Sequence, residues 1–256
     1  MSERPTGLDL TFSLDGKTAL ITGGGSGIGA AIAEMYAAKG ARLAIADINL
    51  AVASEVAAAA GESARAFSCD VADPTSVAAL SEAVVAELGR VDILVNSAGV
   101  VRLDPAENLS VQAWDTTLDV NLKGTFLMCQ AIGRHMLVAG RGKIINLASQ
   151  AGSVALDGHL AYCASKFGVI GLSKVLASEW GGRGVTVNTV SPTVVLTALG
   201  REAWGGAKGE AMKKLIPTGR FAYPEEIAAA AVFLGSDASD MINGADLLID
   251  GGYTIR

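Results

Sequence analysis

The feature that most constrains the fold is a glycine-rich segment between an apolar run and an alanine-rich stretch. Residues 17–22 (KTALIT) are followed by Gly23, Gly27 and Gly29, and the alanine-rich stretch extends to Lys39. This order predicts a buried strand, a tight turn and a helix. Glycines let the backbone approach a pyrophosphate, and free N–H groups at the helix N-terminus stabilise its charge. The segment therefore predicts a dinucleotide site, although its GxxxGxG spacing differs from GxGxxG and a flexible turn is the alternative.

The same alternation of strand and helix continues along the chain, about seven times in all. Strand-like runs recur at 42–46, 64–69, 91–95, 143–147, 185–190 and 247–249. This pattern predicts a Rossmann-type α/β fold, with a doubly wound parallel sheet covered by helices on both faces. No linker-like break interrupts the 256 residues. We therefore expect one domain over 1–256, with a short arm over 1–14 and a glycine-rich substrate loop or mobile lid over 194–216.

Small and polar residues follow the predicted strands. Right-handed crossovers bring the carboxyl ends of parallel strands to one edge, where open α/β sheets bind their ligands. The segments that we expect to converge there are 23–29, Asp47, Asp70, 96–99 (NSAG), Ser149 and Pro192. Small residues at this edge leave room for a flat ligand.

Asp47 bears on the type of dinucleotide. It ends the second apolar run, about 20 residues after the glycines, where a carboxylate can accept hydrogen bonds from the adenosine ribose. Its charge would repel a 2′-phosphate, and Ile48 and Asn49 offer no cation to neutralise one. We therefore expect NAD rather than NADP. An N-cap for the next helix is the alternative role of Asp47.

Ser149, Tyr162 and Lys166 predict proton transfer at an alcohol or carbonyl oxygen. On a helix, residues four apart share a face, so the Tyr162 phenol would lie beside the Lys166 ammonium. We expect this cation to lower the phenol pKa from its ordinary value near 10. Ser149, from the preceding strand end, could hold the reacting oxygen. Alone, a tyrosine and a lysine at this spacing are more often a surface pair.

Composition excludes several other functions. The net charge is −6 and no long basic run is present, which disfavours nucleic acid and anionic membranes as partners. Three cysteines without metal-ligand spacing predict reduced thiols, a cytoplasmic protein and no metal site. Residues 1–10 lack the apolar core of a signal peptide. No apolar stretch of about 18 residues without charges indicates a membrane span.

Taken together, these motifs resemble the short-chain dehydrogenase/reductase family over residues 14–256. They are TGGGSGIG at 22–29, NSAG at 96–99, Asn121, Ser149, YxxxK at 162–166, Ser191-Pro192 and DGG at 250–252. Two positions depart mildly from the family pattern, since Ser97 replaces a second asparagine and Thr193 replaces a glycine.

The resemblance implies roles for individual residues. Catalysis would rest on Asn121, Ser149, Tyr162 and Lys166, with Asn121 positioning a water for proton relay and Lys166 also holding the nicotinamide ribose. The implied cofactor contacts are Gly23, Ser26, Gly27, Ile28, Gly29, Asp47, Asp70, Val71, Asn96, Ala98, Gly99, Tyr162, Lys166, Pro192, Val195 and Thr197. A homotetramer that pairs the long helices 111–139 and 161–180 between subunits is also implied.

One loop narrows the substrate class. Residues 191–204 (SPTVVLTALGREAW) resemble the corresponding loop of L-xylulose reductase and related sugar-alcohol dehydrogenases, as does His159. On a helix, His159 would share a face with Tyr162 and Lys166. An imidazole hydrogen-bonds hydroxyls, and the Trp204 indole covers a C–H face while offering an N–H. We expect Ser149, His159, Tyr162 and Trp204 to contact the substrate, although a solvated His159 and a packing role for Trp204 remain alternatives.

The leading prediction is therefore an NAD-dependent oxidoreductase that interconverts a small polyol and its ketose. Threitol, arabitol, xylitol and galactitol all have a suitable size. A reductase of carrier-bound 3-oxoacyl groups is the first alternative, and the acidic net charge and the Trp204 loop count against it. A non-catalytic NAD-binding sensor is the second, and it would have no need of the complete Ser149, Tyr162 and Lys166 set.

Overall fold

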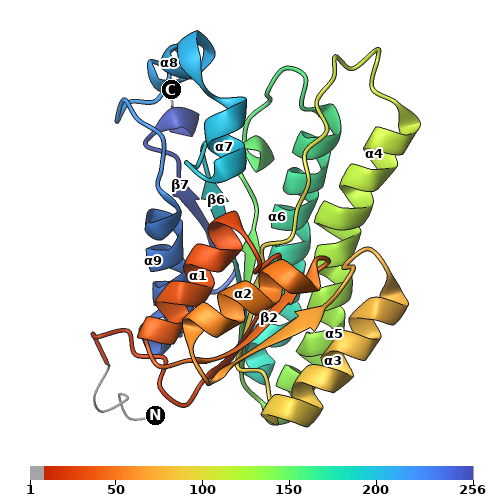
Figure 1. Ribbon diagram of the computed structural model, residues 1–256, viewed down its shortest axis with the longest axis vertical. Coiled ribbons are helices and arrows are strands. Elements are labelled where there is room, and N and C mark those ends of the chain that lie inside the picture. Colours follow the sequence, from red (N-terminus) through yellow and green to blue (C-terminus); the bar gives the residue numbers. More distant parts are fainter. Residues whose placement is uncertain (1–8, 256) are drawn as a thin grey trace.

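The protein, represented by a computed structural model, is described over residues 9–255 and is built around one parallel sheet (Figure 1). Most of the predicted arm over 1–14 lies outside the described residues. The strands are β1 (Thr18–Thr22), β2 (Arg42–Asp47), β3 (Ala64–Ser68), β4 (Ile93–Asn96), β5 (Gly142–Leu147), β6 (Val185–Pro192) and β7 (Asp246–Ile249). All neighbours pair in parallel, in the order β3-β2-β1-β4-β5-β6-β7. The predicted doubly wound sheet of seven strands is confirmed within this range.

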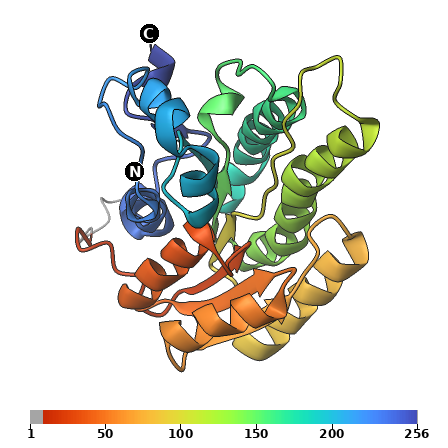
Figure 2. The same cartoon turned by 45° about the horizontal axis from the view of Figure 1, so that its top comes forward.

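Helices cover both faces of the sheet (Figure 2). They are α1 (Gly27–Ala38), α2 (Leu50–Ala60), α3 (Pro74–Leu88), α4 (Val111–Leu118), α5 (Gly124–Ala139), α6 (Leu160–Trp180), α7 (Ala198–Ala203), α8 (Gly206–Lys213) and α9 (Pro224–Gly235). Side chains alternate along each strand, so β1 sends Ile21 to a core under α1, α2 and α9, and Leu20 to a core under α3, α5 and α6. This two-sided burial explains the continuous apolar runs in the sequence.

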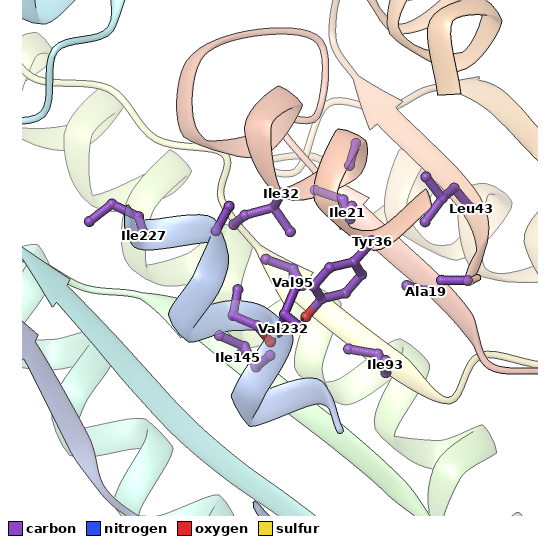
Figure 3. Close-up of a cluster of buried hydrophobic side chains, with 14 of the residues drawn as sticks. Ala19, Ile21, Ile32, Tyr36, Leu43, Ile93, Val95, Ile145, Ile227 and Val232 are labelled. Carbon is purple, nitrogen blue, oxygen red and sulfur yellow. Dashed lines mark hydrogen bonds between the residues drawn. The ribbon is translucent and has the colours of Figure 1, made fainter. Parts of the chain in front are cut away.

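Helix α1 packs closely against α9 on one face of the sheet (Figure 3). Tyr36 of α1 is fully buried, and its hydroxyl donates a hydrogen bond to the Ala231 carbonyl of α9 at 2.8 Å. A Cβ at Gly235 would lie 2.8 Å from the same hydroxyl. The absence of a side chain there lets the two helices approach, which anchors α1 beneath the site.

Helix ends follow the chemistry visible in the sequence. Asp73 caps α3 by accepting the Thr75 N–H at 2.9 Å, and Pro74 occupies the first helical position. Gly89 ends the helix with a φ of +81°, a conformation that favours glycine. These caps set the length of α3, and the chain then enters β4 at the edge of the sheet opposite the carboxyl ends of the strands.

The long helical stretch predicted over 111–139 is confirmed, and it contains one irregular turn. Helices α4 and α5 are joined by a π-helical turn, Asp119–Lys123, which contains Asn121. A π-turn inserts extra backbone and occurs frequently at functional sites. The sequence did not predict this turn, in which the Asn121 side chain makes the tertiary hydrogen bonds described below.

Helix α6 is long and apolar enough, together with the turn that follows it, to meet a compositional test for a membrane span over 160–183. It lies along β6 with Val169 and Ala177 buried. It also carries Tyr162 and Lys166 to the carboxyl edge of the sheet. We therefore interpret it as a helix that covers the sheet.

Candidate active site

A cavity of about 720 Å³ opens at the carboxyl edge of the sheet, a volume within the range of small-molecule sites. Helices α7 and α8 stand over the end of β6 at this edge (Figures 1 and 2). Of the residues predicted for the site, seventeen line the cavity: Gly23, Ser26, Gly27, Ile28, Asp47, Asp70, Val71, Ala98, Gly99, Ser149, His159, Tyr162, Lys166, Pro192, Val195, Thr197 and Trp204. Residues from distant parts of the chain thus converge at the carboxyl ends of the strands, as the sequence predicted.

The glycine cradle, residues 23–29, is packed so closely against neighbouring segments that side chains at Gly23 or Gly25 would not fit. Gly23 and Gly27 have φ values of +62° and +54°. A Cβ at Gly23 would lie 2.7 Å from the backbone of Ala98, and one at Gly25 would lie 2.9 Å from Asp47 Oδ2. Gly29 does not line the cavity, and a Cβ there would overlap the Gly23 carbonyl. The glycine therefore permits close packing of the first turn of α1, and the expected cofactor contact at Gly29 stays a prediction.

Asp47 is held in place by backbone donors. Its Oδ2 accepts the Gly25 N–H at 3.1 Å, and its Oδ1 accepts the Asn49 N–H at 3.0 Å. The N-cap of α2 is Asn49, which accepts the Ala51 N–H, so the alternative role for Asp47 is not adopted. The glycine cradle and this fixed carboxylate together fit the pyrophosphate and ribose of a dinucleotide.

Ser149, Tyr162 and Lys166 come together from the end of β5 and the first turns of α6. Ser149 accepts the Ala151 N–H at 3.1 Å, which orients its hydroxyl. Lys166 is buried and donates from Nζ to the Leu147 carbonyl at 2.7 Å. The same Nζ lies 5.6 Å from the centroid of the Tyr162 ring. The Tyr162 phenol and the Lys166 ammonium are therefore neighbours, as predicted, but no direct hydrogen bond joins them.

The expected pKa of Tyr162 was wrong in direction. Burial disfavours the phenolate and raises the pKa of Tyr162, while a hydrogen bond with Ser149 acts to lower it. The Lys166 ammonium, which donates to the Leu147 carbonyl, does not outweigh the effect of burial on the Tyr162 pKa in the protein alone. Burial also lowers the pKa of Lys166 to about 8. Phenol and ammonium are thus both pushed toward their uncharged forms in the protein alone.

Asn121 uses its side chain as a tether. Its Oδ1 accepts the Val100 N–H at 2.8 Å, and its Nδ2 donates to the Val100 carbonyl at 2.9 Å and to Ser165 Oγ at 3.1 Å. These bonds hold the strand β4 loop against α6. A Cβ at Gly99 would lie 3.3 Å from Asn121 Oδ1, so a glycine permits this approach. Asn121 does not itself line the cavity, and its proposed water-binding role stays a prediction.

Asn96 also lies away from the cavity. Its Nδ2 donates to Asn146 Oδ1 at 2.8 Å and to Cys129 Sγ at 3.3 Å, beneath the sheet. Asn146 continues this buried network by donating to Ser173 of α6 at 2.8 Å. Alternation along β4 directs the Asn96 side chain into the core, where it has a structural role, and the expected cofactor contact at Asn96 stays a prediction.

His159 and Trp204 lie at the cavity as well. His159 is the N-cap of α6 rather than part of the helix, and its ring centroid lies 6.3 Å from that of Tyr162. Trp204 follows α7, packs edge-on against Phe221 at 6.3 Å, and has Lys208 Nζ 4.4 Å from its ring centroid. Both predicted substrate residues therefore line the same cavity as the tyrosine.

Two polar side chains at the cavity were missed in the sequence. Gln150 is 3% exposed and Thr193 is 8% exposed, and neither Gln150 Oε1 nor Thr193 Oγ1 has a hydrogen-bond partner. Buried polar atoms normally have partners, so these two are candidates for ligand contacts. Their positions directly after Ser149 and Pro192, at two strand ends, were the available signal.

Metal chemistry has no visible donor set in the part of the chain that the structure describes. Across residues 9–255, no group of three or more histidine, cysteine or acidic side chains is close enough to hold an ion. Cys69, Cys129 and Cys163 are free.

A Rossmann sheet with a glycine cradle, an acidic second-strand end and a serine, tyrosine and lysine set defines a dinucleotide-dependent oxidoreductase. The family described as enoyl-(acyl carrier protein) reductase matches residues 23–254. The chain belongs to the short-chain dehydrogenase/reductase family, which confirms the resemblance found in the sequence.

Two curated relatives and one solved structure place the chain within this family. D-threitol dehydrogenase from Mycolicibacterium smegmatis is 68% identical over 97% of both chains. NAD-dependent glycerol dehydrogenase from Listeria innocua is 50% identical over 98% of both. A gluconate 5-dehydrogenase from Burkholderia cenocepacia, solved with NADP and tartrate, is 37% identical with a TM-score of 0.92, and the alignment covers 96% of this chain and 98% of that one.

Proposed function

We propose that the protein is an NAD-dependent dehydrogenase that interconverts a small sugar alcohol and its ketose. The observation that carries the proposal is one cavity holding Tyr162 and Ser149 for proton transfer beside His159 and Trp204 for a polyhydroxylated chain. The names of the threitol and glycerol dehydrogenases, at 68% and 50% identity, support the substrate class.

The glycine cradle and Asp47 would hold the dinucleotide. The fixed Asp47 carboxylate favours ribose hydroxyls and disfavours a 2′-phosphate. This supports NAD, in agreement with the name of the glycerol dehydrogenase and in contrast to the NADP in the Burkholderia structure. When bound, the nicotinamide supplies the hydride chemistry, and the protein supplies orientation and proton transfer.

Tyr162 would remove the hydroxyl proton of the substrate during oxidation and return one during reduction. Ser149 would hydrogen-bond the reacting oxygen while its charge changes. Lys166, anchored on Leu147, would place a positive charge 5.6 Å from the Tyr162 ring and favour the phenolate. Because burial opposes that phenolate, the proton transfer depends on these neighbours being in place.

A reductase of carrier-bound acyl groups is the second candidate, and the description of the matching family favours it. The imidazole and indole at the cavity support a short polyhydroxylated substrate instead. A non-catalytic NAD-binding sensor is a third possibility, which the complete set of Ser149, Tyr162 and Lys166 disfavours.

Assembly and location belong to the same proposal. We expect a homotetramer that pairs α5 and α6 between subunits, supported by half-exposed Phe126, Phe167 and Val175 on these helices. We expect a cytoplasmic protein, supported by three free thiols. Light scattering of the purified protein tests the assembly.

Absorbance at the NADH band tests the function directly. The panel contains glycerol, threitol, arabitol, xylitol and galactitol with NAD and, in parallel, NADP, and a 3-oxoacyl thioester is assayed in reverse. Turnover of at least one polyol with NAD supports the proposal. Turnover of the thioester alone favours the acyl reductase, and NAD binding without turnover of any compound favours the sensor.

A further inference from the structure

His159 has one ring nitrogen committed to the backbone. Its Nδ1 lies 2.7 Å from the carbonyl oxygen of Asp157. A carbonyl oxygen can only accept a hydrogen bond, so Nδ1 carries the hydrogen. In a neutral imidazole the other nitrogen then has no hydrogen and is an acceptor. The backbone of the turn thus selects a tautomer in which Nε2 presents a lone pair.

The same turn holds the ring at the cavity. The His159 N–H donates to the Leu156 carbonyl at 3.1 Å, and the His159 carbonyl accepts the Cys163 N–H at 2.7 Å. Asp104 donates its N–H to the Gly158 carbonyl at 3.1 Å, which ties this turn to the loop after β4. Because the backbone is fixed on both sides and Nδ1 is occupied, Nε2 is the nitrogen left for a ligand.

We propose that His159 selects substrates by accepting a hydrogen bond through Nε2 from a hydroxyl other than the reacting one. This inference rests on the proposed polyol dehydrogenase function and assigns the direction of one hydrogen bond in it. The reacting oxygen belongs to Tyr162 and Ser149, and the neighbouring hydroxyl must then donate to His159. A carboxylate, ketone or ether at that place brings only lone pairs, so sugar acids and diketones are disfavoured there.

The tautomer can be measured without any substrate. The chain has two histidines, His135 and His159, so a protein labelled with ¹⁵N-histidine gives two sets of imidazole signals. His135 is exposed on α5, and a His135→Gln variant assigns the signals. In alkaline buffer, which keeps free imidazole neutral, we expect His159 to carry its hydrogen on Nδ1. A hydrogen on Nε2 overturns the proposal whatever the enzyme turns over.

Substrate analogues then test the recognition. For the best polyol of the panel, each non-reacting hydroxyl is replaced in turn by hydrogen or by fluorine, which accepts hydrogen bonds but cannot donate one. At one position we expect both analogues to lose kcat/KM equally, by about tenfold, the size of one hydrogen bond. In His159→Ala this loss should disappear, while in the control His135→Ala it should persist.

The outcomes distinguish a failure of the proposed His159 hydrogen bond from a failure of the proposed polyol dehydrogenase function. A fluoro analogue that keeps the activity of the parent, while the deoxy analogue loses it, shows that His159 donates and overturns the proposal. A deoxy penalty of unchanged size in His159→Ala overturns it as well. If no polyol is turned over, the proposed function and the recognition role fail together, while the tautomer measurement still reports whether Nε2 is an acceptor.

Discussion

The ammonium of Lys166 donates a hydrogen bond to the carbonyl oxygen of Leu147 at 2.7 Å, across the junction of α6 and β5. This bond fixes the helix that carries Tyr162 to the strand that ends at Ser149. The ammonium is buried, with 5% of the residue exposed, and faces no carboxylate at salt-bridge distance in the described chain. Position and burial together account for its lowered pKa.

Replacing Lys166 by methionine should remove a specific pH dependence of stability. Burial lowers the Lys166 pKa from 10.5 to about 8, so between these values the unfolded chain binds more protons than the folded one. This group's contribution to the free energy of unfolding therefore rises with pH across that window, by on the order of 3 kcal/mol in all. Urea unfolding at several pH values should show the protein that retains Lys166 gaining on Lys166→Met as pH increases.

The comparison with the variant is essential because other groups titrate in the same range. Burial raises the pKa values of Cys69 and Tyr162, and raises that of Cys129 to about 12. The contribution of each group to the free energy of unfolding therefore falls as the pH rises through the pKa that the group has in the unfolded chain. The effects of Cys69 and Cys129 are present in both proteins and cancel in the difference. Because Lys166 Nζ lies 5.6 Å from the Tyr162 ring, both proteins carry Tyr162→Phe to remove the coupled titration of Tyr162. Parallel stability curves for the two proteins would contradict the burial of a charged Lys166.

Tyr162→Phe should abolish most turnover without disturbing the dinucleotide cradle. The variant lacks the proton-transfer group, whose loss commonly costs about 10²–10⁴-fold in rate. The ring that lines the cavity is retained, so NAD affinity should remain within a few-fold of the wild type. Steady-state kinetics and fluorescence titration with NAD measure the two quantities. Turnover at the wild-type rate would refute the assignment of Tyr162.

Asp47→Asn should relax the choice of dinucleotide. The amide keeps an acceptor oxygen for the Gly25 or Asn49 N–H but removes the charge that repels a 2′-phosphate. We expect the ratio of kcat/KM for NAD to that for NADP to fall by about tenfold or more, equivalent to about 1.4 kcal/mol. The urea midpoint should change little. A wild-type enzyme that prefers NADP, or an unchanged ratio in the variant, would show that Asp47 does not set this preference.

The strand ends made most of the site predictable from the sequence. Parallel pairing with right-handed crossovers leaves one edge for every carboxyl end, so residues as distant as Asp47 and Pro192 had to meet. The strand, glycine turn and helix around Gly23 restricted the ligand further. Each of these features is a short stretch of neighbouring residues, yet it determines where distant segments meet in the fold. A reading of the sequence was therefore sufficient to find them.

Features that depend on tertiary contacts were not predictable in the same way. The π-turn contains Asn121, whose side chain bonds to Val100 and Ser165, and no helical periodicity records such contacts. The raised pKa of Tyr162 follows from burial, and a spacing of four residues to Lys166 does not report burial. Asn96 has the motif position of a ligand contact, but strand alternation turns its side chain into the core.

Gly23→Ala should separate backbone strain from obstruction of the cradle. Gly23 has a φ of +62°, and a Cβ there would lie 2.7 Å from the backbone of Ala98. Gly89, at the end of α3, has a φ of +81° with nothing within 4 Å of a Cβ, so Gly89→Ala carries the strain alone. Strain of this kind costs about 1–2 kcal/mol of stability.

Both alanine variants should therefore lose stability in urea unfolding, and Gly23→Ala should lose more because the backbone at Ala98 must shift. NAD titration distinguishes them further. The affinity of Gly89→Ala should match the wild type, because α3 ends at the opposite edge of the sheet. The affinity of Gly23→Ala should fall by about tenfold or more, because the methyl group would push against the Ala98 backbone and displace the turn that lines the cavity. Equal NAD affinity in the two variants would show that the glycine at position 23 serves the turn and not the ligand.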